Sequence, residues 1–110
     1  MDSQTDNWTY AEFHAFIMLY AANTDGHITL EEENLIMPTL AQDEYARIKT
    51  IFMGCDDSVA LDLILSYKDK YCGTQAEKDK ILADMLAMYQ ADEAYDQIER
   101  GVYHLFERML

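Results

Sequence analysis

The sequence predicts an all-α fold, a compact single-domain bundle of about six or seven helices. Three observations support this prediction: helix-start signals recur along the chain, apolar residues repeat at helical spacing, and strand-like alternation is nearly absent. A chain of 110 residues has room for one hydrophobic core. We therefore expect residues 1–110 to form one domain, with residues 1–8 as an N-terminal lead-in.

The expected helices begin at capping boxes, in which a short oxygen-bearing side chain is followed three residues later by Glu or Gln. The pairs are Thr9 with Glu12, Thr29 with Glu32, Thr39 with Gln42, Thr74 with Glu77, and Asp96 with Glu99. A sixth start is expected at Asp56, Asp57 and Ser58. Helix ends are expected at Gly26, Pro38, Gly54 and Gly73. The predicted helices are 10–22, 30–37, 40–53, 58–72, 75–91 and 97–109.

The fourth predicted helix, 58–72, differs from the others in its apolar pattern. The other helices carry an apolar stripe on one face, such as Phe13, Phe16 and Ile17 in the first. The fourth is apolar on most of its sides. We therefore expect this helix to lie at the centre of the bundle.

The chain is strongly acidic, with 21 Asp and Glu against eight Lys and Arg and a formal charge of −13. Such a charge repels phosphates and anionic lipid, so we expect no nucleic-acid partner and no direct membrane insertion. It attracts cations or a basic protein partner. No apolar run approaches the roughly 20 residues needed to span a bilayer, and no secretory signal is present, so we expect a cytoplasmic protein. Cys55 and Cys72 are expected to be free thiols.

Two acidic turns resemble each other at a fixed spacing. Asp25 is followed seven residues later by Glu32, as Asp92 is by Glu99, an offset of 67 residues at both ends (92 − 25 and 99 − 32). Each acid alone also has a structural interpretation, as a turn or cap residue. Four carboxylates that face each other would repel unless a cation lay between them.

The paired turns therefore predict a divalent-cation site. Calcium is the preferred ion because hard cations take oxygen ligands, with manganese or zinc as alternatives. The predicted ligands are Asp25, Glu32, Asp92 and Glu99, with Asn23 and Asp96 as weaker candidates.

Residues 21–32 alone match part of a calcium-binding EF-hand loop. With the glycine of the Asp-Gly turn at position six, Asn23, Asp25 and Glu32 fall at positions three, five and twelve. Position one is Ala21 where an Asp is expected, so this loop alone should bind calcium weakly. A degenerate EF-hand-like module that uses only residues 21–32 is the alternative function.

The stretch Tyr20–Glu32 resembles the first signature of the TerB-like family of tellurite-resistance and stress-response proteins: an Ala-rich helix end, Asp-Gly, a small cap and a Glu. Residues 91–99 are similar to the second signature, with Glu93 where Gly is usual. The resemblance covers about residues 9–110. It implies a bacterial, non-enzymatic, all-helical protein whose partner is a protein, often membrane-associated. It also implies acidic clusters that bind a divalent metal, which on this chain map to Asp25, Glu32, Asp92 and Glu99.

The chain contains no recognisable catalytic motif. Its three His residues lack zinc-ligand spacing, and no Ser/His/Asp arrangement or phosphate-binding loop is present. A carboxylate hydrolase that uses Asp25 or Asp92 is the alternative from the enzyme class, but no base is paired with either. We therefore expect no enzymatic activity. Trp8 is expected to be a hydrophobic staple rather than a binding residue.

Overall fold

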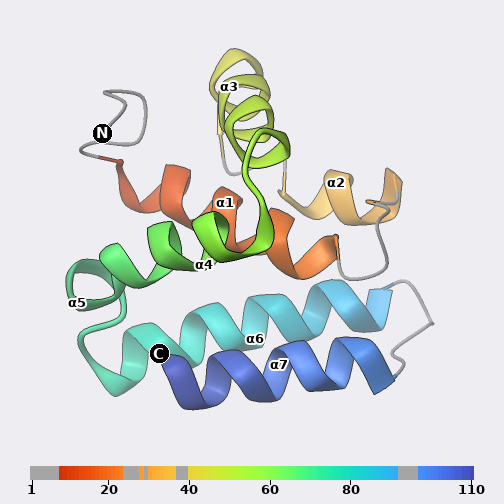
Figure 1. The fold of residues 1–110 in the computed structure, drawn as a ribbon. Coiled ribbons are helices and arrows are strands. Elements are labelled where there is room, and N and C mark those ends of the chain that lie inside the picture. The colour runs from red at the N-terminus through yellow and green to blue at the C-terminus, as the bar shows by residue number, and fades with distance from the viewer. Residues whose placement is uncertain (1–7, 24–27, 29, 37–39, 92–96) are drawn as a thin grey trace.

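Seven α-helices make up the part of the chain that the computed structural model describes, which is residues 8–23, 28, 30–36, 40–91 and 97–110, without the side chains of 30–32, 91 and 97–99 (Figure 1). They are α1 (Tyr10–Ala22), α2 (Leu30–Ile36), α3 (Gln42–Met53), α4 (Asp57–Ser66), α5 (Lys68–Tyr71), α6 (Gln75–Ala91) and α7 (Gln97–Met109). No strand occurs within these ranges. The radius of gyration of 12.9 Å is close to the ~13 Å expected for one domain of this length. The predicted all-α single-domain fold is confirmed.

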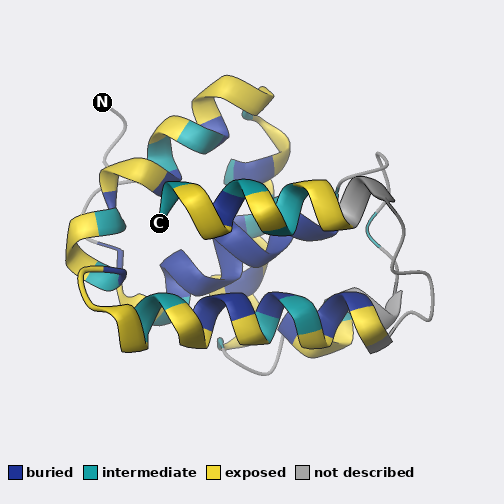
Figure 2. Ribbon diagram, turned by 90° about the horizontal axis from the view of Figure 1, so that it is seen from below, coloured by how far each residue is buried: buried dark blue, intermediate teal, exposed yellow. Residues whose placement is uncertain are grey.

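Helix α1 lies at the centre of the bundle. It contacts α2, α3, α4, α6 and α7, and ten of its 13 residues are buried. The antiparallel pair α6 and α7 lies on one side of α1, α3 lies on the opposite side, and α2 also contacts α6 (Figures 1 and 2). The composition of α1 is compatible with this position, because Glu12 is the only Asp, Glu, Lys or Arg in the helix.

The prediction that the fourth helix is central was wrong. Helix α4 packs mainly against α1 and buries only Ala60 and Ile64, while Val59 and Leu65 are exposed. An apolar composition alone does not show which helix is covered on all sides. Helix α1 is the more deeply buried helix because α2, α3, α6 and α7 pack against it as well as α4.

Three predicted helix starts fall within the described residues and are confirmed. Thr9 and Glu12 form a complete capping box, in which each side chain accepts a hydrogen bond from the other residue's amide at 3.2 and 2.9 Å. Asp56 caps α4, and Thr74 accepts a bond from the Glu77 amide at 3.2 Å. Local side-chain chemistry therefore sets the beginnings of α1, α4 and α6.

Helix α3 begins two residues later than predicted. Its N-cap is Ala41, which has no side-chain oxygen and makes no capping bond. The helix ends at Gly54 as predicted, but with φ of −85°, so the ending is right-handed and does not require glycine for its conformation. Of the other predicted boundary residues, Gly73 lies two residues after the end of α5, and Gly26, Thr29, Pro38, Thr39 and Asp96 lie outside the described residues.

The predicted single helix 58–72 is divided into α4 and α5 at Tyr67. The Ser66 hydroxyl donates to the carbonyl of Leu63 at 2.6 Å. In a continuous α-helix this carbonyl would accept a hydrogen bond from the Tyr67 amide. The Tyr67 amide bonds instead to Ile64 at 3.1 Å, three residues back. Competition from a serine side chain thus accounts for the break.

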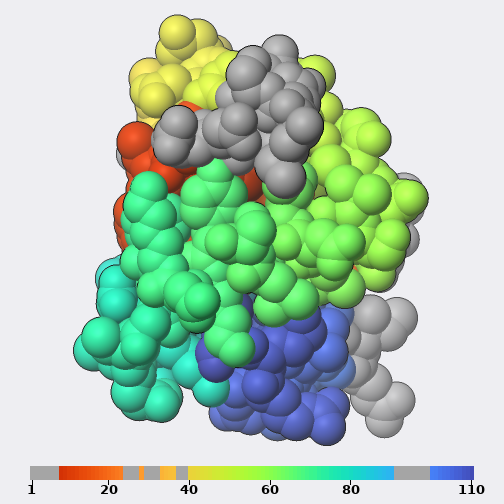
Figure 3. All heavy atoms as spheres, turned by 60° about the vertical axis from the view of Figure 1, so that its left-hand side comes forward, coloured from red at the N-terminus to blue at the C-terminus, as the bar shows by residue number. Residues whose placement is uncertain are grey.

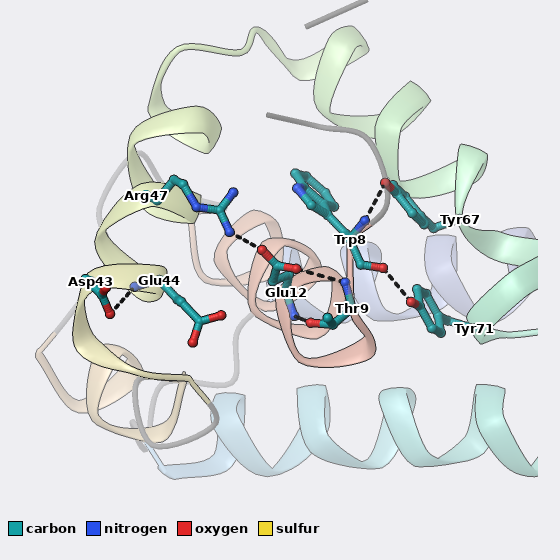
Figure 4. A network of polar contacts seen from close by, with 8 residues as sticks. All are labelled: Trp8, Thr9, Glu12, Asp43, Glu44, Arg47, Tyr67 and Tyr71. Atoms are coloured by element: carbon teal, nitrogen blue, oxygen red, sulfur yellow. Dashed lines mark hydrogen bonds and ion pairs between the residues drawn. The ribbon is translucent and has the colours of Figure 1, made fainter. Parts of the chain in front are cut away.

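Trp8 is hydrogen-bonded to, and stacks on, tyrosines of the α4–α5 segment (Figure 4). Its amide donates to the Tyr67 hydroxyl at 3.0 Å, and the Tyr71 hydroxyl donates to its carbonyl. Its ring is 1% exposed and stacks on Tyr67, with centroids 5.3 Å apart and an angle of 11° between the rings. The predicted lead-in therefore ends in a residue of the hydrophobic core.

Glu12 links α1 to α3 (Figure 4). Its second carboxylate oxygen accepts a hydrogen bond from the Arg47 guanidinium. Burial acts to raise the pKa of Glu12, but the Thr9 amide and Arg47 outweigh it and hold the pKa below its ordinary value. The ionised form of Glu12 therefore stabilises the fold.

Replacing Glu12 with Gln is expected to lower the free energy of unfolding at neutral pH by about 1–2 kcal/mol, because hydrogen bonds to a charged group are the stronger ones. Since folding lowers the pKa of Glu12, its contribution is complete above the ordinary value of 4.5 and is lost as the pH falls through the folded value. Urea unfolding of the native chain and the variant, from neutral pH to about pH 3, should show that the difference between their free energies of unfolding becomes smaller. A difference that stays constant over this range would contradict the prediction.

Candidate functional site

Most of the predicted metal ligands lie outside the described side chains. Asp25, Asp92 and Asp96 are not among the described residues. Glu32 and Glu99 are each the third residue of a helix, of α2 and α7, but only their backbones are described. The weaker candidate Asn23 ends α1, where its amide donates to the Leu19 carbonyl at 3.1 Å. The predicted four-carboxylate site thus stays a prediction.

The described residues just before the two predicted turns lie side by side. The Tyr89 hydroxyl donates to the Ala21 carbonyl at 2.7 Å, and both residues are fully buried. Ala21 is one residue from the end of α1, and Tyr89 is two residues from the end of α6. These helix ends and the start of α7 lie together at the right-hand side of Figure 1. The chain therefore leaves α1 and α6 at the same end of the bundle.

The described side chains themselves offer neither a metal cluster nor a reactive thiol. No three His, Cys, Asp or Glu among them lie close enough together to hold a metal ion. Cys55 and Cys72 are free thiols, as predicted. Burial raises the pKa of Cys72 to about 11, and burial followed by the nearby Asp56 raises that of Cys55. Both thiols are protonated at neutral pH and are therefore poor nucleophiles.

A polar cavity of about 220 Å³ opens beside the C-terminal end of α1. Its described lining is Tyr20, Asn23, Phe52, Cys55, Asp56, Asp57, Ala60 and Val102.

Tyr20 and the two acids of this lining are hydrogen-bonded within the chain. The Tyr20 hydroxyl donates to Asp57 at 2.7 Å, and Asp56 accepts 2.9 Å bonds from the Val59 amide and the Ser58 hydroxyl. The amide bond, followed by the hydroxyl bond, holds the pKa of Asp56 below its ordinary value. Burial, followed by the bond to Asp57, raises the pKa of Tyr20. The described lining of the cavity therefore includes an ionised Asp56 at neutral pH.

A second polar group joins α1 to α6. The Nε2 atom of His14 lies 2.9 Å from Asp84 Oδ2, which also accepts from Lys80 at 2.6 Å. Burial acts to raise the pKa of Asp84, but the bonds from Lys80 and His14 outweigh it and the pKa is lowered. A cavity of about 120 Å³ lies there, and its described lining, which adds Tyr10 and Ala11, contains no Ser, Thr or Cys. Among the described residues, the His–Asp pair therefore has no hydroxyl or thiol of Ser, Thr or Cys beside it in this cavity.

Sequence reasoning missed both of these polar groups. Asp56 and Asp57 were predicted only to start a helix, although one acid is enough for a cap. His14 was set aside because it lacks ligand spacing, although a His within the apolar sequence of α1 needs a polar partner when buried. The sequence signals that could have found these groups were the second acid at the predicted cap, Asp56–Asp57, and the polar His14 within an apolar helix.

Comparison of the chain with protein-family models, curated proteins and solved structures gives no match. The TerB-like resemblance therefore stays a prediction that rests on the residues around the two acidic turns. Within the described ranges, no helix combines the length and apolarity needed to cross a membrane.

Proposed function

We propose that the chain is a TerB-like, non-enzymatic binding module that holds a divalent cation, calcium by preference, between its two acidic turns. The observation that carries this proposal is the buried hydrogen bond from Tyr89 to Ala21. It ties together the two segments from which the chain enters the turns. The stress-response role and the protein partner implied by the resemblance belong to the same proposal.

Chain geometry supports a shared site. Asp25 follows Ala21 by four residues and Asp92 follows Tyr89 by three. At about 3.6 Å per residue, the Cα atoms of these acids lie at most about 14 and 11 Å from the two bonded residues. Helix α2, which carries Glu32, packs against α6, and α7, which carries Glu99, packs against α1 and α6. These limits and helix contacts are compatible with one site formed by all four acids.

Electrostatics favours a cation there. The formal charge of −13 makes the binding of another carboxylate or phosphate unfavourable and that of a cation favourable. The protonated thiols give no support to a catalytic alternative, and neither does a His–Asp pair whose described cavity lining lacks Ser, Thr and Cys. A cation also relieves the repulsion among acids, so binding and folding stability should be linked.

Calcium is expected to raise the melting temperature of the native chain. At a tenfold excess over Kd, binding adds about 1.4 kcal/mol to the free energy of unfolding, on the order of 6–11 °C for a domain of this size. The Asp25→Asn, Asp92→Asn variant should lose this shift, measured by calorimetry at constant ionic strength. Manganese and zinc are titrated in parallel.

The matched control is Asp43→Asn, Glu44→Gln, which removes two exposed acids from the first turn of α3 and should retain the shift. Glu99→Gln distinguishes the alternative, because a module that uses only residues 21–32 would be unaffected by it. No binding of calcium, manganese or zinc at millimolar concentration would exclude the cation proposal.

A further inference from the structure

Helix α4 exposes apolar residues on the surface of the bundle. Val59 is 45% exposed and Leu65 40%, and Met53, at the end of α3, is 62% exposed. Val59, Asp62 and Leu65 follow one another at intervals of three residues, so they form a ridge along the helix. Figure 3 views the face that α4, in green, crosses. We call this ridge, together with Met53, the α4 face.

The α4 face is acidic as well as apolar. Helix α4 contains Asp57 and Asp62, Asp56 caps it, and none of its ten residues is Lys or Arg. A carboxylate has about four lone-pair sites, so the bonds that Asp56 and Asp57 make within the chain leave acceptor capacity for an outside donor. Apolar side chains among acids complement a surface that is both apolar and basic.

The polar cavity lies at the N-terminal end of the α4 face. Its 220 Å³ is below the roughly 300–1,000 Å³ of sites that enclose a whole small-molecule ligand, so it suits a single side chain. Phe52, Ala60 and Val102 provide an apolar wall, and Asp56 and Asp57 are the acids of its lining. This arrangement matches a Lys or Arg, which buries its aliphatic stem and keeps its charged end at the edge.

We propose that the α4 face binds a basic amphipathic helix of a partner protein, with one Lys or Arg side chain in the cavity. Its apolar residues cover Val59, Leu65 and Met53. This site goes beyond the proposed cation site, because it uses α4 and the α3–α4 corner rather than the acidic turns. A second copy of the chain fits poorly, because a two-fold contact would place the acids of α4 against each other.

The probe is a synthetic helical peptide with one Leu-rich face and one face rich in Lys and Arg. Titrated into the isotopically labelled chain, it should shift the NMR signals of α4, Tyr20 and Asn23. A peptide of the same composition in scrambled order should bind at least about tenfold more weakly, since it cannot present both faces at once.

Two pairs of variants test the surface. Asp56→Asn, Asp57→Asn should weaken peptide binding by roughly tenfold, while Asp43→Asn, Glu44→Gln removes the same charge elsewhere and should change it less than about threefold. Asn is also a good N-cap, so α4 should keep its start.

Val59→Ser, Leu65→Ser should also weaken binding by roughly tenfold, whereas Leu35→Ser, at an exposed position of α2, should not. The proposal would be overturned if the two acidic double variants lost peptide affinity equally, or if the peptide shifted NMR signals of residues away from α4. The proposal would also be overturned if the native chain formed dimers and the Val59→Ser, Leu65→Ser variant did not, because a second copy would then occupy the α4 face. If calcium shifts the NMR signals of Asp56 and Asp57 and displaces the peptide, the cavity is a cation site instead, which also overturns the proposal. Asp25→Asn, Asp92→Asn should leave peptide binding unchanged, so this test and that of the cation site can fail separately.

Discussion

Replacing Trp8 with Ala is expected to lower the free energy of unfolding by about 3–5 kcal/mol, the usual cost of removing a large buried aromatic ring. The ring is 1% exposed and packs between Phe16, with centroids 4.9 Å apart, and Tyr67, at 5.3 Å. Its loss leaves a cavity between α1 and the α4–α5 segment. The two tyrosine hydroxyls bonded to the Trp8 backbone cannot fill that space.

Urea unfolding followed by circular dichroism measures this effect, because Trp8 is the only tryptophan and its fluorescence is lost in the variant. Trp8→Phe should give an intermediate loss, since it keeps one ring. Leu35→Ala, at an exposed site, should change stability by less than about 0.5 kcal/mol. A loss below about 1 kcal/mol for Trp8→Ala would mean that residues 1–8 are a dispensable lead-in.

Helix starts were predictable where the side chain of the N-cap residue bonds a nearby amide. The capping oxygens of Thr9 and Asp56 lie within three residues of the amides they bond, so the sequence contains both partners. The break at Tyr67 was missed because it depends on which of two donors takes the Leu63 carbonyl. Periodicity says nothing about such competition.

The position of each helix in the bundle was less predictable than its existence. Helices α1 and α4 are both rich in apolar residues, yet only α1 is covered on several sides. Burial depends on the neighbours that a helix acquires, which its own residues do not specify.

The hydrogen bonds between distant residues were not predicted from the sequence. His14 and Asp84 are 70 residues apart, and Tyr20 and Asp57 are 37 apart. The repeat of the acidic turns at an offset of 67 residues predicts that the two turns lie close together, and this stays a prediction. The bond from Tyr89 to Ala21 joins residues 68 apart, close to that offset.

Truncating Tyr89 to Ala is expected to cost about 3–5 kcal/mol, because its ring is fully buried. Tyr89→Phe keeps the ring and removes only the hydroxyl, at a cost of about 1–3 kcal/mol. Ala21 has one of the last four carbonyls of α1, which have no partner within the helix, so the variant removes a hydrogen bond from a buried acceptor. Thermal and urea unfolding of the two variants separates the packing of the ring from the bond.

Tyr89→Phe should also reduce the calcium-induced rise in melting temperature, because the bond holds the ends of α1 and α6 together beside the proposed cation site. Tyr20→Phe is the matched control: it removes a hydroxyl bonded to the exposed Asp57, and the calcium response should persist. If Tyr89→Phe loses stability but responds to calcium as fully as the native chain, the bond supports only the core. Calcium binding would then not depend on joining the two turns, as expected of the alternative that uses only residues 21–32.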